Sequence, residues 1–159
     1  MIQAIYDAPF LGRLLLSEED GLLRSIRFSS GDLGEVTLGP SPTLTLTVQA
    51  LDAFFAGTPI PEELTLAPEG TPFQREVWAV LRTIPRGETR TYGEIARLIG
   101  RPNALRAVGQ ACHRNPIPLL IPCHRVVGAA GLTGYAGGLE RKRTLLAMEG
   151  ILSPKLLQK

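Results

Sequence analysis

The sequence of 159 residues contains two cysteines and two histidines, and all four fall in two copies of Cys-His-Arg, at residues 112–114 and 123–125. A cysteine beside a histidine is a candidate nucleophile, because a free thiol has a pKa of about 8.5 and reacts as the thiolate. The same four side chains could bind zinc. However, adjacent residues point in different directions, and the usual gap of about two to four residues between ligands is missing. The spacing therefore favours thiol chemistry over zinc.

The two cysteines have different surroundings. Cys112 falls on a predicted helix with the period of Val108 and Ala111, which is typical of a small buried side chain. Cys123 follows three prolines and an apolar run in residues 116–122, which predicts a rigid bend beside the core. The histidine after it would reach the sulfur through an intervening water. From the residues alone, a nucleophile and a buried structural cysteine remain equally open for Cys123.

Charge is distributed unevenly about a linker-like stretch at residues 67–72. Residues 1–70 hold three arginines against ten acidic residues, a formal charge of −7, and no Cys or His for a soft-ligand metal site. Residues 71–159 hold fourteen basic residues against five acidic ones, a formal charge of +9. We expect an acidic domain over 1–70 and a basic domain over 71–159. The basic domain is suited to a polyanion, and nucleic acid is the preferred interpretation over an uneven solvated surface.

In the acidic domain the sequence predicts a small α+β unit. Two β-like runs, Gly12–Leu16 and Leu22–Phe28, are joined by a turn-like stretch at residues 18–21 and predict a hairpin. The stretch Leu46–Ala56 has apolar residues on one face and Gly57 after it, which indicates a helix.

In the basic domain the sequence predicts three successive helices. Thr71 and Gln74 form a capping box for a helix reaching about Ile84, and Thr91 and Glu94 form a second one for a helix to Ile99. Asn103 is expected to cap a third helix. The second and third helices match a helix-turn-helix in length, although a simple αα-hairpin has the same pattern.

Several protein classes are excluded. No uncharged apolar run approaches the ~18 to 20 residues of a membrane span, and the N-terminus lacks the basic region of a secretory leader. Two cysteines are too few for a disulfide framework and fit free thiols in a reducing compartment. We therefore expect a cytoplasmic protein that does not interact with membranes.

The motifs of the basic domain resemble one family. The resemblance rests on residues 115–127, which include Pro-Cys-His-Arg, together with residues 91–93, 106–109, 134–139 and 145–150. This set is similar to the methylated-DNA–protein-cysteine methyltransferases, the 6-O-alkylguanine repair proteins, and covers essentially all of residues 71–159. The resemblance implies an α+β fold. A small ribonuclease H-like N-terminal α/β lobe would precede a C-terminal helical domain with a helix-turn-helix and a winged loop.

The resemblance also implies the chemistry. Cys123 would accept the alkyl group of the guanine in one irreversible transfer, without a cofactor. A relay would run from Cys123 through water to His124 as base and Glu149 as the group that orients it. Asn115 would tie the reactive loop to the helix-turn-helix through hydrogen bonds. Tyr92 would press on the target phosphate and hydrogen-bond to the base, while from the residues alone it is an aromatic packed on the core.

Further roles follow from the resemblance for DNA and for the pocket. Arg106 would fill the gap left by a flipped nucleotide, whereas taken by itself it is an ordinary phosphate contact. The glycine-rich stretch 128–138 would close the guanine pocket, and its other interpretation is a flexible wing. The expected DNA-binding residues are Thr91, Tyr92, Asn103, Ala104, Arg106 and Arg125. The expected pocket residues are Cys112, Val126, Tyr135, Ala136 and Gly137.

The expected substrate is double-stranded DNA containing 6-O-alkylguanine, with 4-O-methylthymine as a secondary candidate, and the expected state is a monomer without a metal. Ala136 stands where some relatives carry a serine, so a contact to the guanine oxygen there must come from backbone N–H. Two other functions stay open at this point. One is a helix-turn-helix DNA binder in which Cys123 is structural, and the other is a cysteine hydrolase with an oxyanion hole.

Overall fold

The computed structural model describes residues 1–29, 39–129, 131, 134–135 and 137–151. The chain divides into two units. The first consists of Met1–Glu69 and Pro116–Leu120, and the second of Gly70–Asn115 and Ile121–Lys159. The short segment Pro116–Leu120 therefore belongs to the first unit, although the residues on both sides of it belong to the second.

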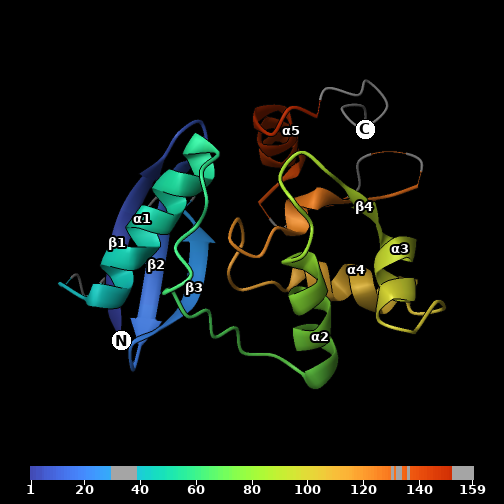
Figure 1. Cartoon of the computed structure of the whole chain (residues 1–159), viewed down its shortest axis with the longest axis horizontal. Coiled ribbons are helices and arrows are strands. Elements are labelled where there is room, and N and C mark those ends of the chain that lie inside the picture. The colour runs from blue at the N-terminus through green and yellow to red at the C-terminus, as the bar shows by residue number, and fades with distance from the viewer. Residues whose placement is uncertain (30–38, 130, 132–133, 136, 152–159) are drawn as a thin grey trace. The chain divides into compact units, whose positions relative to one another are not determined.

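The first unit is a three-stranded antiparallel sheet with one helix against it (Figure 1). Its strands are β1 (Ile2–Ala8), β2 (Gly12–Glu19) and β3 (Leu22–Phe28), in the order β1-β2-β3, and its helix is α1 (Pro42–Ala56). The central strand β2 is buried without interruption from Leu14 to Glu18, so side chains on both of its faces are covered.

The predicted hairpin is confirmed, and its turn is tighter than expected. Asp20 and Gly21 have φ values of 55° and 76°, the left-handed pair that a two-residue hairpin turn requires. Glu18 and Glu19 pair with β3 instead of forming part of the turn. The Glu18 carboxylate accepts a hydrogen bond of 3.1 Å from the Gly21 amide, which holds the turn closed.

Helix α1 begins earlier than the expected Leu46. The Ser41 side chain accepts a hydrogen bond from the Leu44 amide, and Pro42 occupies the first turn, where its missing N–H costs nothing. The helix ends as predicted at Gly57, whose φ of 74° suits a residue without a Cβ. The segment Pro116–Leu120 joins this unit through a 2.9 Å hydrogen bond from the Ile26 amide to the Pro116 carbonyl.

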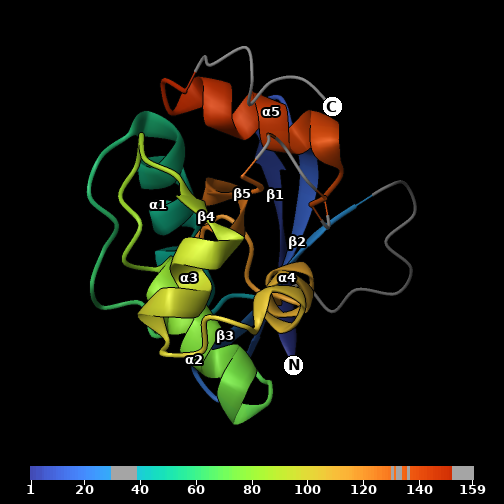
Figure 2. The same cartoon turned by 90° about the vertical axis from the view of Figure 1, so that its right-hand side faces the viewer.

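The second unit is helical (Figure 2). It contains α2 (Pro72–Leu81), α3 (Tyr92–Leu98), α4 (Leu105–His113) and α5 (Leu139–Met148), a 3-10 turn η1 (Cys123–Arg125), and the two-residue strands β4 (Arg90–Thr91) and β5 (Val126–Val127). The strands β4 and β5 pair in parallel, which joins the start of α3 to the segment that follows Cys123.

Both predicted capping boxes are confirmed. Thr71 and Gln74 exchange side-chain and backbone hydrogen bonds at the start of α2, and Thr91 and Glu94 do so at α3. Helix α2 ends at Leu81, three residues before the expected Ile84. The expected cap by Asn103 is wrong, because α4 begins after Ala104 and no side-chain cap bond is present there. Just before α4, the Ala104 N–H donates a hydrogen bond to the Arg101 carbonyl.

The core of the second unit is organised around Trp78, which is 1% exposed. Its indole Nε1 donates a 2.8 Å hydrogen bond to the carbonyl of Ala111, so α2 is fixed to α4 by a buried polar contact as well as by packing. Helices α3 and α4 also pack on each other and form the predicted pair of short helices. The predicted α+β fold class, a sheet-containing N-terminal part followed by a helical part, is confirmed. Much of the expected winged loop lies outside the described residues. Within the described part of the chain, no helix has the length and apolar character needed to span a bilayer.

The packing around Trp78 predicts the effect of adding one methyl group. A Cβ at Gly70 would overlap the indole ring of Trp78 and lie 2.7 Å from the Gln74 side chain, whereas a Cβ at Gly109 would meet no atom within 4 Å. We expect Gly70→Ala to lower the free energy of unfolding by about 1–3 kcal/mol through overpacking. The matched variant Gly109→Ala should leave it unchanged or raise it by about 0.5–1 kcal/mol, because alanine is the better helix former. Urea unfolding measures both, and equal stabilities would contradict this account of the packing.

Candidate active site

Cys123 lies in a short, tightly bonded turn. The preceding Pro122 ends the proline-rich stretch, and the Cys123 amide donates a 2.8 Å hydrogen bond to the Ile121 carbonyl. The Arg125 amide bonds to the Pro122 carbonyl at 3.0 Å, which closes the 3-10 turn. The cysteine is free and 5% exposed. The rigid bend expected for this residue is therefore present.

Asn115 connects this turn to the end of α4. Its side-chain Nδ2 donates a 2.8 Å hydrogen bond to the Ile121 carbonyl, and its backbone N–H donates to the Cys112 carbonyl at 3.3 Å. The amide also hydrogen-bonds to the Cys123 sulfur, which favours the thiolate. Asn115 is 9% exposed, so these bonds satisfy a polar side chain that burial would otherwise penalise.

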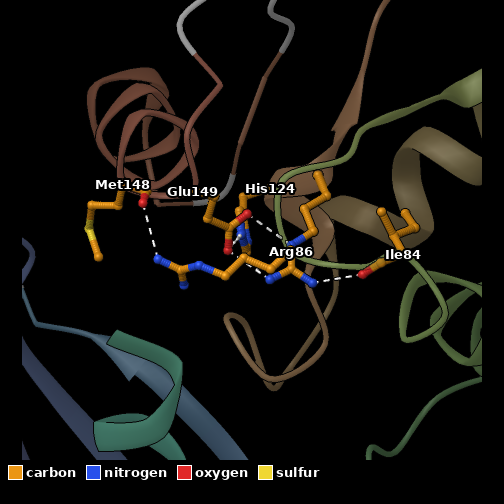
Figure 3. A network of polar contacts seen from close by, with 6 residues as sticks. Ile84, Arg86, His124, Met148 and Glu149 are labelled. Carbon is orange, nitrogen blue, oxygen red and sulfur yellow. Dashed lines mark hydrogen bonds and ion pairs between the residues drawn. The ribbon is translucent and has the colours of Figure 1, made fainter. Parts of the chain in front are cut away.

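One carboxylate, that of Glu149, joins the two residues that follow the cysteine (Figure 3). His124 Nε2 lies 3.1 Å from Glu149 Oε2. Arg125 donates through Nε to Oε1 at 2.9 Å and through Nη2 to Oε2 at 2.7 Å, the paired geometry in which a guanidinium binds a carboxylate most strongly. All three are buried, at 0% exposure for His124, 6% for Glu149 and 9% for Arg125.

The same network is fixed to the loop after α2. Arg125 Nη1 donates a 2.7 Å hydrogen bond to the Ile84 carbonyl, and Arg86 Nη2 donates one of 3.0 Å to the Met148 carbonyl at the end of α5 (Figure 3). A cation at the C-terminal end of a helix is favourable, and it offsets the anion of Glu149 placed there. Segments that lie far apart in the sequence thus meet at one carboxylate.

The surroundings of Glu149 and His124 set the charges of these two side chains. Burial by itself raises the pKa of Glu149, but the hydrogen bonds from Arg125 and His124 outweigh it and lower the pKa to about 2. For His124, burial lowers the pKa more than the Glu149 carboxylate raises it. Glu149 is therefore an anion and His124 a neutral imidazole near pH 7. Because an ionised carboxylate only accepts hydrogen bonds, the imidazole proton sits on Nε2 and Nδ1 is left as the proton acceptor.

The thiol of Cys123 is held in its protonated form. Burial raises its pKa, and the Asn115 amide and the ammonium group of Lys142 lower it only in part. Lys142 is 0% exposed, and its Nζ donates to the carbonyls of Val126 at 2.7 Å and Gly134 at 3.4 Å. Burial lowers the pKa of Lys142 to about 8, while the neighbouring thiols raise it. A partial positive charge therefore accompanies the sulfur in an otherwise apolar site.

The sulfur has access to a pocket. A hollow of about 160 Å³ is lined by Tyr92, Gly109, Cys112, His113, Cys123, Gly134 and Tyr135. Burial raises the pKa of Tyr135 well above its ordinary value, so its hydroxyl stays protonated and can donate a hydrogen bond. The pocket thus brings together four of the residues that the resemblance implied for the site, namely Cys123, Tyr92, Cys112 and Tyr135.

A second, wider hollow of about 670 Å³ lies over α3 and α4. Its lining consists of Thr91, Tyr92, Gly93, Arg97, Leu105, Arg106, Gly109 and Ala129. Arg97 and Arg106 are exposed there, and Leu105 is 50% exposed, which is unusual for a large apolar side chain. Arg97 and Arg106 make this side of α3 and α4 a basic face. Because Tyr92 and Gly109 line both hollows, the basic face and the pocket of Cys123 share an edge.

The remaining described residues that were predicted for the site line neither of the two hollows. Asn103 is exposed and Ala104 half-buried at the start of α4, while Val126 is buried and uses its carbonyl to accept from Lys142. Gly137 is half-buried and its carbonyl accepts from Arg141, and Ala136 lies outside the described residues. Arg125, expected to bind DNA, points into the interior and is committed to Glu149 and Ile84 in this structure.

The two Cys-His-Arg copies do not assemble into a zinc site in the part of the chain that the structure describes. No group of three or more His, Cys, Asp and Glu side chains there is arranged to hold a metal ion. His124 faces Glu149, whereas His113 is exposed at the end of α4.

Two residues of the site were missed by sequence reasoning. Lys142 lies in a run of charged residues at the start of α5, where a solvent-exposed side chain is the usual expectation, and nothing in its neighbours indicates burial. Arg86 follows a proline in what reads as a turn. Both act through backbone carbonyls of residues distant in the sequence, which leave no pattern in the chain.

Comparisons with known proteins agree with these features. A family model described as the DNA-binding domain of 6-O-methylguanine DNA methyltransferase matches residues 72–151. A methylated-DNA–protein-cysteine methyltransferase of Methanosarcina acetivorans is 46% identical over 155 residues, which cover 94% of this chain and 99% of that protein. One from Methanosarcina barkeri is 59% identical over 154 residues, covering 94% and 97%. The crystal structure of Mycobacterium tuberculosis OGT in complex with DNA matches with a TM-score of 0.83 at 44% identity, covering 94% of this chain and 92% of that one.

The charge network predicts a specific dependence of stability on pH. Since the pKa of Glu149 is about 2 in the folded protein and about 4.3 in an unfolded chain, the carboxylate stabilises the fold fully above pH ~4.3. This contribution is lost as the pH falls toward 2. We expect Glu149→Gln to lower the free energy of unfolding at pH 7 by about 3 kcal/mol, because Arg125 is left as a buried unpaired charge.

Urea unfolding of the wild type and of Glu149→Gln at several pH values between 7 and 2 measures this difference. The gap between the two proteins should narrow below pH ~4.3. Glu140→Gln, at an exposed carboxylate in the first turn of α5, is the control and should show a far smaller difference. A gap that stays constant down to pH 2 would contradict the assignment.

Proposed function

Because this chain belongs to the methylated-DNA–protein-cysteine methyltransferase family, we propose that it repairs duplex DNA by taking the alkyl group of 6-O-alkylguanine onto Cys123. The observation that carries the proposal is the position of one sulfur. Cys123 is buried, yet it lines a pocket that adjoins a basic face, and the residue after it is a histidine bonded to a carboxylate. The Mycobacterium tuberculosis relative was crystallised with DNA, which supports DNA as the partner.

The target base must leave the duplex to reach this sulfur. An alkyl group inside stacked DNA cannot approach a buried thiol, so the nucleotide rotates into the pocket, as other base-modifying enzymes require. Arg106 is exposed on α4 and lines the wide hollow beside the pocket, which suits it to occupy the vacated position. Thr91 and Tyr92 line the same hollow, and Asn103 and Ala104 lie at the adjacent end of α4, within reach of phosphates.

The reaction is a single displacement. The Cys123 thiol gives its proton through water to His124, and the sulfur attacks the sp³ carbon in line with the bond to the guanine oxygen. The sulfur–carbon bond forms as the carbon–oxygen bond breaks, and the guanine that leaves takes up a proton. The product is S-alkylcysteine in the protein and an intact guanine in the DNA. The acceptor is consumed, so each chain acts once.

The surroundings fit these roles. His124 is neutral, with Nδ1 as the proton acceptor, and the Glu149 carboxylate stabilises the imidazolium that forms. Asn115 favours the thiolate and fixes the turn that carries it. Tyr92 lines both hollows, where its hydroxyl can reach a base in the pocket or a phosphate beside it.

The proposal extends to organisation and setting. Residues 71–159, apart from the segment 116–120 that belongs to the first unit, form the DNA-binding and alkyl-accepting domain, and the chain acts as a monomer on chromosomal DNA in the cytoplasm. Both cysteines are free thiols, which a reducing compartment preserves, and the transfer requires the thiol of Cys123. The reaction as written uses only the thiol, the base and a proton relay, so it calls for no cofactor. 4-O-methylthymine presents the same alkyl–oxygen bond and is the secondary substrate.

Intact-mass analysis tests the proposed reaction. After incubation with excess duplex DNA carrying 6-O-methylguanine, each chain should gain one methyl group and then stop, and peptide mapping should place it on Cys123. A DNA binder without chemistry would gain nothing, and a hydrolase would turn over with its mass unchanged. Either of these two results would refute the proposal.

The acceptor assignment predicts a separation of binding from transfer. Cys123→Ser replaces the sulfur by a much weaker nucleophile and should abolish methyl gain, while binding to duplex DNA remains and weakens with rising salt. Cys112→Ser is the matched control, because it removes the other thiol of the pocket. Methyl gain by the Cys123→Ser protein would contradict the assignment.

The position of Arg106 predicts a kinetic effect. Arg106→Ala should slow single-turnover methyl transfer by at least about tenfold while lowering overall DNA affinity much less, because flipping is impaired more than attraction to phosphates. Arg101→Ala is the matched control, since Arg101 is exposed on the same unit but stacks on the Phe73 ring at 5.5 Å and does not line the hollow. Equal transfer rates for the two variants would overturn the role given to Arg106.

A further inference from the structure

Two leucines of the second unit keep large apolar side chains at the surface. Leu98, the last residue of α3, is 62% exposed, and Leu105, the first residue of α4, is 50% exposed. A single exposed leucine needs no explanation by itself, so their positions have to distinguish them. Leu105, unlike Leu98, is among the described residues that line the wide hollow of about 670 Å³.

The side chain of Leu105 is held in a defined direction. Helices α3 and α4 pack on each other (Figure 2). A Cβ placed at Gly93 on α3 would lie 3.6 Å from Leu105 Cδ2 and 3.5 Å from Arg97 Nη1, both ordinary van der Waals distances. One methyl group of the leucine therefore lies over Gly93, beside the Arg97 guanidinium, and the exposed part of the side chain contributes to the lining of the hollow.

Along α4, Leu105 lies next to the two positions that the proposed flipping step uses. It directly precedes Arg106, and it lies four residues before Gly109, which places it on the same face of the helix as that glycine. Gly109 lines both hollows and marks the edge that an extruded nucleotide crosses to reach Cys123. Leu105 is therefore one helical turn away from this edge, toward the part of the duplex that stays stacked.

The charges around Leu105 indicate what occupies the hollow. Arg97 and Arg106 are exposed and line it, and no acidic side chain is among the described residues of the lining. A DNA strand presents phosphates, which pair with arginines, and between them deoxyribose rings, whose C–H surface is apolar. An apolar side chain between two cations is complementary to that alternation.

We propose that Leu105 is a DNA-binding residue that packs on the deoxyribose of a stacked nucleotide beside the extruded one and supplies affinity that does not depend on salt. Arg97 supplies a salt-dependent part, and Arg106 serves the flipping step. Because the nucleotide that Leu105 contacts stays stacked throughout, the contact stabilises the complex equally before and after flipping. This inference rests on the proposed function, since it takes duplex DNA as the occupant of the hollow.

Fluorescence anisotropy with unmodified duplex DNA measures this contribution. Leu105→Ala should raise the Kd about three- to tenfold, the loss expected when half of a leucine side chain is no longer buried in the complex. Leu98→Ala is the matched control, because it removes the same atoms from a more exposed leucine outside the hollow, and it should leave the Kd unchanged. Equal Kd values for the two variants would overturn the proposal.

The salt dependence separates an apolar contact from a charged one. In a plot of log Kd against log salt concentration, Leu105→Ala should keep the slope of the wild type. Arg97→Ala should reduce the slope by about 1, because one phosphate contact is lost. A reduced slope for Leu105→Ala would mean that its effect passes through the neighbouring cations, and it would contradict an apolar contact.

Single-turnover transfer with duplex DNA carrying 6-O-methylguanine adds a readout that distortion of α4 would alter. For Leu105→Ala, the DNA concentration at half-saturation should rise by the same factor as the Kd, with little change in the rate at saturation. Leu105→Met keeps the apolar volume and should restore the Kd, whereas the polar Leu105→Gln should not. A slowed saturating rate in Leu105→Ala, or a Leu105→Met protein that binds as weakly, would refute the assignment.

Failure of this inference is distinguishable from failure of the proposed function. A wild-type protein that gains no methyl group from the modified duplex would refute the proposed function. A wild-type protein that transfers the methyl group, together with a Leu105→Ala protein of unchanged Kd, would refute only the role given to Leu105.

Discussion

The site depends on how one buried carboxylate is shared. Glu149 accepts two hydrogen bonds from Arg125 and one from His124, and this is what keeps it ionised with a pKa of about 2 in a place where burial alone would favour the neutral acid. The ionised carboxylate in turn fixes the tautomer of His124. Without Arg125 the carboxylate would be a costly buried charge, and without Glu149 the guanidinium would be one. The pair is therefore a requirement of the fold as well as of the proton relay.

The same burial controls the reactivity of the sulfur. Cys123 is held as a thiol by its apolar surroundings, and the groups that favour the thiolate, Asn115 and Lys142, only partly offset this. A thiol that is protonated at rest is protected from oxidation and from adventitious electrophiles, since the thiolate is the reactive form. Proton transfer to a neutral His124 supplies the thiolate when a base occupies the pocket. The arrangement suits a residue that can be used only once.

Positioning comes from short backbone contacts between segments that are distant in the sequence. The pairing of β4 with β5 joins the start of α3 to the residues after Cys123, Asn115 joins the end of α4 to Ile121, and Arg86 and Arg125 tie α5 to the loop after α2. Each contact ends on a carbonyl or amide of the main chain. The basic face of α3 and α4 and the pocket of the sulfur are thereby held at a common edge, marked by Tyr92 and Gly109.

The sequence by itself determined the features that depend on neighbours along the chain. Capping boxes at Thr71 and Thr91, the hairpin of β2 and β3 and the bend before Cys123 follow from local hydrogen bonding and from restricted backbone angles, and the Pro-Cys-His-Arg motif indicated the family. Local patterns misplaced the cap of α4 at Asn103, because the helix begins after Ala104 and no side chain caps it. Tertiary structure alone decided that Arg125 turns inward to Glu149 and that Lys142 is buried. Those outcomes depend on which charges packing brings together, and the surroundings then change the pKa values of Glu149 and Lys142 in ways that spacing along the chain does not encode.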